Sequence, residues 1–202
     1  MKIIAAMILT LWAGMASATT EELLPALHDV TGVAADDVLN IRSGPGTGNP
    51  VIAALPPDAR GVEVVAASED GAWGLVNTGE GSGWVSMAFL ARQPGQFDGY
   101  APAIATCFGT EPFWDLTEGP GGWQVTTPEG PQERFTPLVP AGPSGWPQSF
   151  AWLGDGAIGA LVVTREQCSD GMSDRAYGLS AALATPSEGG ATLRTGCCAL
   201  TR

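Results

Sequence analysis

Lysine and histidine are the residue types in shortest supply in this chain. Lys2 is the only lysine and His28 the only histidine, whereas aspartate and glutamate together number 21, so the formal charge at pH 7 is −12. A surface of this sign repels nucleic acids and anionic lipid headgroups, because both carry phosphate charges. We therefore expect no nucleic-acid partner.

The single histidine also limits the kinds of catalysis open to the chain. A Ser-His-Asp or Cys-His centre would have to use His28, which we expect to lie in an exposed tail outside either folded core. The sequence contains no G-x-S-x-G elbow, and its cysteines lack the C-x-x-C spacing of common zinc sites. These absences predict a protein without catalytic residues, metal or cofactor.

No apolar run is long enough to span a bilayer, which takes about 20 residues. The longest, at residues 3–15, follows Lys2 and ends in the small residues Ala16-Ser17-Ala18. This order is typical of a secretory signal peptide over residues 1–18 that is removed on export. An uncleaved anchor is the alternative. We expect a periplasmic or secreted protein with no stable membrane insertion after cleavage.

Sustained helical periodicity is missing as well, since no stretch keeps a 3.6-residue apolar repeat over three turns. Short apolar runs alternate instead with turns that draw on 28 glycines and 16 prolines. This pattern is typical of antiparallel β-proteins. We predict an all-β monomer. It would comprise a lead-in at 19–29 with room for one helical turn, a small barrel at 30–92, a linker at 93–103 and a second antiparallel β-barrel or sandwich at 104–202.

Four cysteines, all in the second half, predict disulfides, because an even number in an exported chain usually forms them. A bond between the adjacent Cys197 and Cys198 would be strained, which leaves two pairings. We favour Cys168 with Cys197 and Cys107 with Cys198 over the swapped arrangement. Closing these loops stabilises the fold mainly by restricting the unfolded chain.

Residues 38–90 carry an opening and a closing motif. The run LNIRSGPGT occupies residues 39–47, and GWV at residues 83–85 is followed by Phe89 and Leu90. In these motifs and their spacing the segment resembles the bacterial SH3-type (SH3b) domain. The resemblance implies a small SH3-like barrel that binds cell-wall peptides, peptidoglycan or other proteins and rarely catalyses.

The resemblance implies no single ligand site, so candidates come from the motif residues themselves. Asn40, Arg42, Trp73 and Trp84 are the ligand-binding candidates. Each tryptophan has an alternative role in filling or closing the barrel, since aromatic burial dominates small cores. For Arg42 the alternative is a structural hydrogen bond that holds the loop at residues 43–48.

The second half carries three further motifs, CFGTEPFW at 107–114, CSDGMSDR at 168–175 and GCC at 196–198. In their order it is similar to a group of bacterial envelope proteins, and this likeness supports an architecture more than a function. Five residues are candidates for a ligand site in this half: Glu111, Trp114, Asp170, Asp174 and Arg175.

The charged members of this set also have structural roles open to them. Asp170 and Asp174 can cap backbone amides in a polar turn, and a calcium loop would need more oxygen donors at regular spacing. Glu111 can form a buried ion pair with Arg175, in which loss of one partner would leave an uncompensated charge. The tryptophans of this half are expected to fill its core.

Together these features predict an exported, non-catalytic binding protein of the cell envelope whose partner is peptidoglycan or an envelope protein. A competing hypothesis is an acidic inhibitor of a basic exported enzyme such as a lysozyme, which would present a concentrated acidic patch and bind less tightly in salt. Two enzymatic hypotheses compete as well, an accessory cell-wall hydrolase and a thiol-redox enzyme that uses the adjacent cysteines.

Overall fold

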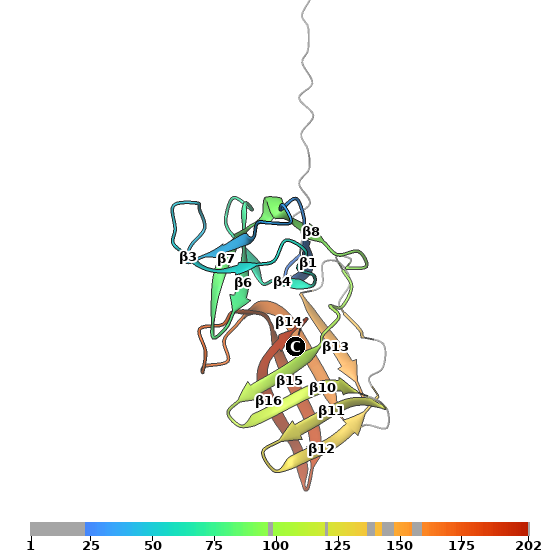
Figure 1. Ribbon diagram of the computed structural model, residues 1–202. Coiled ribbons are helices and arrows are strands. Elements are labelled where there is room, and N and C mark those ends of the chain that lie inside the picture. The colour runs from blue at the N-terminus through green and yellow to red at the C-terminus, as the bar shows by residue number, and fades with distance from the viewer. Residues whose placement is uncertain are drawn as a thin grey trace, which may run out of the picture.

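A computed structural model gives the fold (Figure 1). The residues it describes are 23–96, 99–119, 121–136, 140–142, 148–154 and 159–201. The predicted signal peptide at 1–18 and Trp146 lie outside them. Regular structure in the described part consists of strands and one short 3-10 turn, η1 (Met87–Phe89), which confirms the all-β prediction. This part contains no helix with the length and hydropathy needed to cross a membrane.

The first half of the chain forms two small antiparallel sheets that enclose one core. The three-stranded sheet has the order β4 (Val62–Val64), β1 (Ala26–Val30), β8 (Leu90–Arg92). The five-stranded sheet has the order β3 (Val51–Leu55), β2 (Leu39–Arg42), β7 (Gly81–Ser86), β6 (Trp73–Thr78), β5 (Ala66–Ala67). The buried core residues are Val30, Leu39, Ile41, Val64, Val76 and Val85.

Strand β1 corrects the expectation of a helical turn and an exposed tail before residue 30. It is the middle strand of its sheet, paired on both sides, and its side chains alternate between buried and half-buried. His28 is only 1% exposed, and its Nδ1 atom lies 3.1 Å from the carbonyl oxygen of Ala26. The barrel therefore needs β1 as the strand that joins β4 to β8. The short segment that forms β1 carries no sequence motif that would have predicted this role.

The second half forms one continuous antiparallel sheet of eight strands. Its spatial order is β12 (Gly130–Phe135), β11 (Gly122–Thr127), β10 (Phe113–Gly119), β9 (Thr106–Thr110), β16 (Gly190–Ala199), β15 (Tyr177–Ser187), β14 (Ala160–Cys168), β13 (Ser149–Leu153). Strands that follow each other in the chain pair directly, except β12 and β13, which lie at the two ends of this order; the last strand, β16, also pairs with the first, β9.

The eight-stranded sheet curls on itself, as a barrel does. Trp123 on β11 and Trp152 on β13 are six strands apart in the order, which in a flat sheet would separate them by about 29 Å. Their ring centroids are only 6.0 Å apart. Both rings are buried together with Trp114, which confirms core filling by these three tryptophans. The two ends of the sheet thus face each other across one hydrophobic core.

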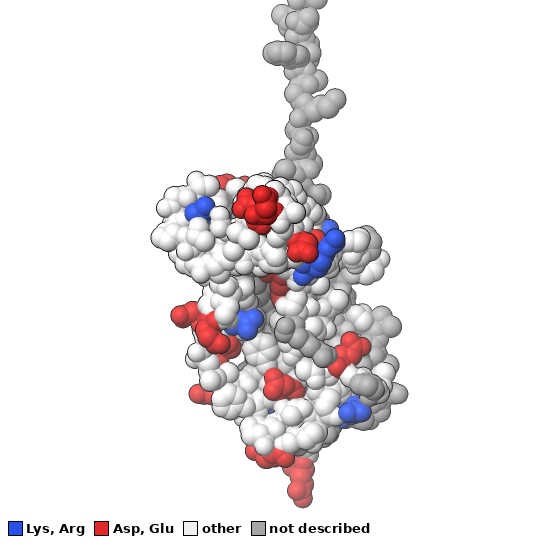
Figure 2. All heavy atoms as spheres, viewed as in Figure 1, with Lys and Arg blue, Asp and Glu red and all other residues white. Residues whose placement is uncertain are grey.

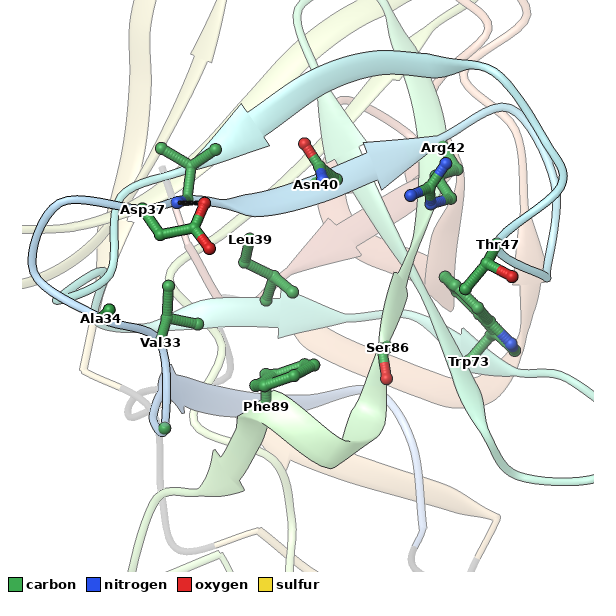
Figure 3. A pocket seen from close by; sticks show the side chains of 12 residues that line it. Val33, Ala34, Asp37, Leu39, Asn40, Arg42, Thr47, Trp73, Ser86 and Phe89 are labelled. Atoms are coloured by element: carbon green, nitrogen blue, oxygen red, sulfur yellow. Dashed lines mark hydrogen bonds between the residues drawn. The ribbon is translucent and has the colours of Figure 1, made fainter.

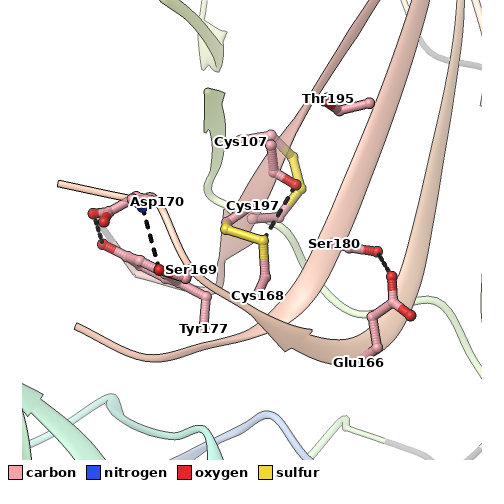
Figure 4. Close-up of a disulfide and its surroundings, with 12 residues drawn as sticks. Cys107, Glu166, Cys168, Ser169, Asp170, Tyr177, Ser180, Thr195 and Cys197 are labelled. Carbon is pink, nitrogen blue, oxygen red and sulfur yellow. Dashed lines mark hydrogen bonds between the residues drawn. A yellow bond between two sulfur atoms is a disulfide. The ribbon is translucent and has the colours of Figure 1, made fainter. Parts of the chain in front are cut away.

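Both disulfides join strands of this sheet and match the favoured pairing (Figure 4). Cys107 on β9 bonds Cys198, which lies directly opposite it on β16. Cys168, the last residue of β14, bonds Cys197 on β16. The described structure has no free cysteine.

Hydrogen bonds connect the two halves through the turn after Cys168. The side-chain amide of Asn77 donates to the carbonyl oxygen of Ala176 over 2.9 Å and accepts from the Ala176 N–H over 2.9 Å. The backbone N–H of Asp174 donates to the carbonyl oxygen of Glu80 over 2.9 Å. The first half therefore rests on the second with its β6–β7 hairpin against this turn (Figure 1).

Candidate ligand-binding groove

A groove of about 460 Å³ opens on the first half of the molecule, beside strand β2 (Figure 3). The loop before β2, the strand itself, the start of β6 and the turn η1 contribute to it. Its lining residues are Gly32, Val33, Ala34, Asp37, Val38, Leu39, Asn40, Arg42, Thr47, Trp73, Ser86 and Phe89.

The strand registers explain how the predicted residues come together. Asn40 and Arg42 alternate on β2 with the buried Leu39 and Ile41, so both lie on the same face. Trp73 pairs with Ser86 across β6 and β7, and both line the groove. The structure thus unites Asn40, Arg42 and Trp73 in one hollow.

Trp84, the fourth candidate of this half, lies beside the groove. It pairs directly with Arg42 across β2 and β7 and therefore shares the outer face of that strand pair. Its side chain is half-buried and is not part of the groove lining. Trp84 is placed to support Arg42 from the side, outside the hollow itself.

Arg42 has the structural bond that was expected as its alternative role. Its Nη1 atom donates to the carbonyl oxygen of Asn49 over 2.8 Å, which ties β2 to the far end of the following loop. A guanidinium carries five N–H donors, so this bond leaves four. Within the described residues those four have no hydrogen-bond partner. The same side chain can therefore hold the loop and bind an anionic group.

Further polar groups in the groove are also open to a ligand. The side chains of Asn40, Thr47 and Ser86 make no hydrogen bond to the described part of the protein. Asp37 accepts the Val38 N–H with Oδ1 over 2.8 Å and keeps its second oxygen open to solvent. Between these groups the apolar surface comes from residues such as Phe89, which is 40% exposed. The groove suits a ligand with both apolar and charged parts.

Sequence reasoning missed Val33, Asp37, Thr47 and Phe89 as groove residues. Val33 and Asp37 belong to a loop before β2 that carries no motif of its own. Thr47 stands in the opening motif and Phe89 in the closing motif, which were the available signals, but their positions beside the groove depend on the fold. The loop and η1 are about 50 residues apart in sequence, so only the closed barrel brings them to one place.

The five candidates of the second half do not form one site. Glu111 and Asp170 line a shallow hollow of about 310 Å³ beside Cys168. Trp114 is only 1% exposed and donates its Nε1–H to the carbonyl oxygen of Thr195 over 3.0 Å. It belongs to the core, which corrects its assignment as a ligand contact.

Asp170 caps the backbone amides of its turn, which is the structural role expected as the alternative to ligand binding. Its Oδ1 atom accepts the backbone N–H groups of Met172 over 3.0 Å and Ser173 over 2.9 Å, and Oδ2 accepts the Ser173 hydroxyl over 2.7 Å. Partial burial tends to raise the pKa of Asp170, but these hydrogen bonds to the charged form outweigh it and hold the pKa below 3.8.

The expected buried ion pair between Glu111 and Arg175 is wrong. Both residues are exposed, and the Arg175 guanidinium lies over the ring of Tyr177, 5.8 Å from its centroid. Asp174 meets the first half through its backbone, where its carbonyl oxygen accepts the Ser82 hydroxyl over 3.3 Å. Asp174 thus belongs to the contact between halves, whereas Arg175 packs on Tyr177 within the second half.

The acidic side chains do not gather in one place on the face seen in Figure 2. They form several separate groups spread over both halves, some of them beside arginines. The lysozyme-inhibitor hypothesis required a concentrated acidic patch, so this face gives it no support.

A small barrel of two packed antiparallel sheets, with a groove on its outer face, defines the first half as an SH3-type domain. Comparison with protein families agrees, because residues 37–91 match the bacterial SH3 domain. Searches of curated proteins and of solved structures found no match for the chain. The family match ends at residue 91, so the second resemblance, over residues 104–202, has no support from it.

Proposed function

We propose that this chain is an exported, non-catalytic binding protein of the cell envelope whose SH3 domain binds peptidoglycan or an envelope protein. The observation that carries the proposal is the groove, because nine of its twelve lining residues lie within the segment that matches the bacterial SH3 domain. Aromatic walls beside open hydrogen-bonding groups are typical of a binding site for a small ligand.

Export is supported by two independent features. The N-terminal sequence has the order of a signal peptide, and the second half contains two disulfides. Disulfides form and persist in oxidising compartments such as the periplasm and the extracellular space.

A binding role is supported over catalysis by the chemistry of the groove. Its charged lining residues are Asp37 and Arg42, and an arginine does not release a proton in the physiological range. His28, the residue type best suited to acid–base work near neutral pH, lies inside the barrel on β1 and outside this lining.

The test is co-sedimentation of the purified mature protein with isolated peptidoglycan sacculi. We expect Trp73→Ala to weaken retention about tenfold, because an aromatic anchor in a groove contributes on the order of 1–2 kcal/mol. Tyr100→Ala is the matched control, since Tyr100 is 70% exposed and lies outside the groove.

Each contrary outcome has a definite meaning. Equal retention of Trp73→Ala and wild type would show that the groove is not the binding site. No retention of wild type would remove peptidoglycan and leave an envelope protein, to be identified by crosslinking in intact cells. Release of soluble fragments from the sacculi by the purified protein would contradict the non-catalytic role.

A further inference from the structure

The groove is electrically polar along its length. Asp37 stands at one end and Arg42 at the other, and they are the two charged residues among those that line it (Figure 3). Asn40 and the apolar Leu39 lie between them. A ligand that spans the groove therefore meets a negative group at one end and a positive group at the other.

The distance between these charges sets the length of a matching ligand. Five residue steps separate Asp37 from Arg42, so their Cα atoms are at most about 17 Å apart in an extended chain. An extended peptide of about five residues has the same reach between its two ends. A peptide shorter than the actual separation of the two charges would contact one charged end only.

Both charged groups have hydrogen-bonding capacity to offer. Arg42 uses one of its donors on Asn49, and Asp37 uses one of its oxygens on Val38, within the described structure. The remaining guanidinium N–H groups match a carboxylate, and the remaining carboxylate oxygen matches an ammonium group. Val33 and Phe89 add apolar surface to the same lining, which matches small apolar side chains.

We propose that the groove binds a short zwitterionic peptide of about five residues, with its ammonium group at Asp37 and its carboxylate at Arg42. This inference rests on the proposed function and names the ligand chemistry of the same site. A cell-wall peptide and a protein-derived peptide can both carry these two charges, and the experiment separates these sources.

The experiment measures binding of Ala-Ala-Leu-Ala-Ala to the purified mature protein through tryptophan fluorescence and calorimetry. Four forms of the peptide are compared: both ends free, N-acetylated, C-amidated, and blocked at both ends. We expect each block to weaken binding roughly fivefold to tenfold, as for partly exposed charge-assisted contacts. The tripeptide Ala-Leu-Ala, with both ends free, should bind no better than a pentapeptide blocked at one end.

Two variants assign each end of the peptide. In the Asp37→Asn variant, N-acetylation of the peptide should no longer weaken binding, while C-amidation should still weaken it. The asparagine Oδ1 can still accept the Val38 N–H, so the local hydrogen bond is kept. In Arg42→Gln the opposite should hold, and Arg42→Lys should restore the effect of amidation because it restores the charge. Asp36→Asn and Arg60→Gln are matched controls, since neither residue lines the groove.

The outcomes separate this inference from the proposed function. If blocked and free peptides bind alike while sacculi are still retained through Trp73, the zwitterionic ligand is wrong and the proposed function stands. If neither peptides nor sacculi bind, the zwitterionic ligand is wrong and peptidoglycan is removed as the partner, while crosslinking in intact cells tests the envelope protein that the proposed function also names. Muropeptides digested from sacculi are compared with the all-L pentapeptide, and tighter binding of one of them identifies the source.

Discussion

Glu63 on β4 shows how one side chain can couple the two halves of the molecule. Its Oε2 atom accepts the Leu200 N–H over 3.0 Å and the Thr201 hydroxyl over 3.3 Å. Within the described residues its Oε1 atom is buried without a hydrogen-bond partner. Burial raises the pKa of Glu63 above its ordinary value of 4.5, because desolvation disfavours the charged form more than these bonds favour it.

This pKa shift predicts a pH dependence of stability. The folded state binds a proton at Glu63 more tightly than the unfolded state, so its contribution to stability is present below about pH 4.5 and is lost as pH rises through the raised pKa. Glu63→Gln should abolish that loss. Urea unfolding from pH 4 to pH 8 should show the variant gaining stability relative to wild type as pH rises.

The control for this measurement is Glu188→Gln, since Glu188 is an exposed residue in the turn between β15 and β16. Its stability difference from wild type should stay constant over the same range. A constant difference for Glu63→Gln would show that Glu63 does not titrate differently in the two states.

Strands β9 and β16 approach each other closely at two glycines. A Cβ atom at Gly196 would lie 1.9 Å from the carbonyl oxygen of Phe108, and one at Gly109 would lie 2.2 Å from the Trp114 Nε1 atom. Backbone and a buried indole occupy these places, so a side chain there requires the strands to separate. The two glycines therefore let the sheet close around Trp114.

Gly109→Ala tests this requirement. We expect it to lower the free energy of unfolding by about 3 kcal/mol, because overpacking a rigid core forces the backbone to shift. Gly119→Ala is the matched control on β10, where a Cβ would meet nothing within 4 Å. Thermal unfolding of both variants checks the contrast, and equal melting temperatures would rule out a close approach at Gly109.

A second part of the contact between the halves joins the turn after Cys168 to the β6–β7 hairpin. Asn77 stands at its centre, since it exchanges two hydrogen bonds with the backbone of Ala176. Asn77→Ala should cost about 1–2 kcal/mol, because it leaves a half-buried N–H and C=O without these partners. Asn49→Ala, whose amide bonds within its own exposed loop, should cost less. Urea unfolding measures the free energy of unfolding of both variants. Equal losses for Asn77→Ala and Asn49→Ala would contradict a stabilising contact between the halves.

The two disulfides differ in how much of the chain they constrain. Cys107 and Cys198 are 91 residues apart and Cys168 and Cys197 are 29 apart. In the chain-entropy account, replacing each pair by alanine should destabilise the fold by about 4.6 and about 3.6 kcal/mol respectively. Cys168 is also half-buried whereas Cys107 and Cys198 are fully buried.

Mild reduction should therefore open Cys168–Cys197 first and leave Cys107–Cys198 until the sheet unfolds. Alkylation of the released thiols followed by peptide mass spectrometry identifies the order. Simultaneous release of all four thiols in folded protein would contradict the difference in burial.

Local patterns predicted the all-β class, and the resemblance carried by two motifs predicted the SH3-type segment. For the cysteines, the sequence left two pairings, of which the structure has the favoured one. Alternation such as buried Leu39 and Ile41 beside outward Asn40 and Arg42 is a property of neighbouring residues, because a strand points successive side chains to opposite faces. The same alternation placed Asn40 and Arg42 together on the outer face of β2, where both line the groove.

Only the tertiary structure decided which distant segments meet. It placed His28 inside the barrel, Trp114 inside the second core, and Asp37 and Phe89 across from each other in the groove. These positions depend on strand pairing between segments far apart in the chain, which short-range patterns do not specify. Periodicity sets the face on which a side chain lies, and the closure of the sheets sets its neighbours.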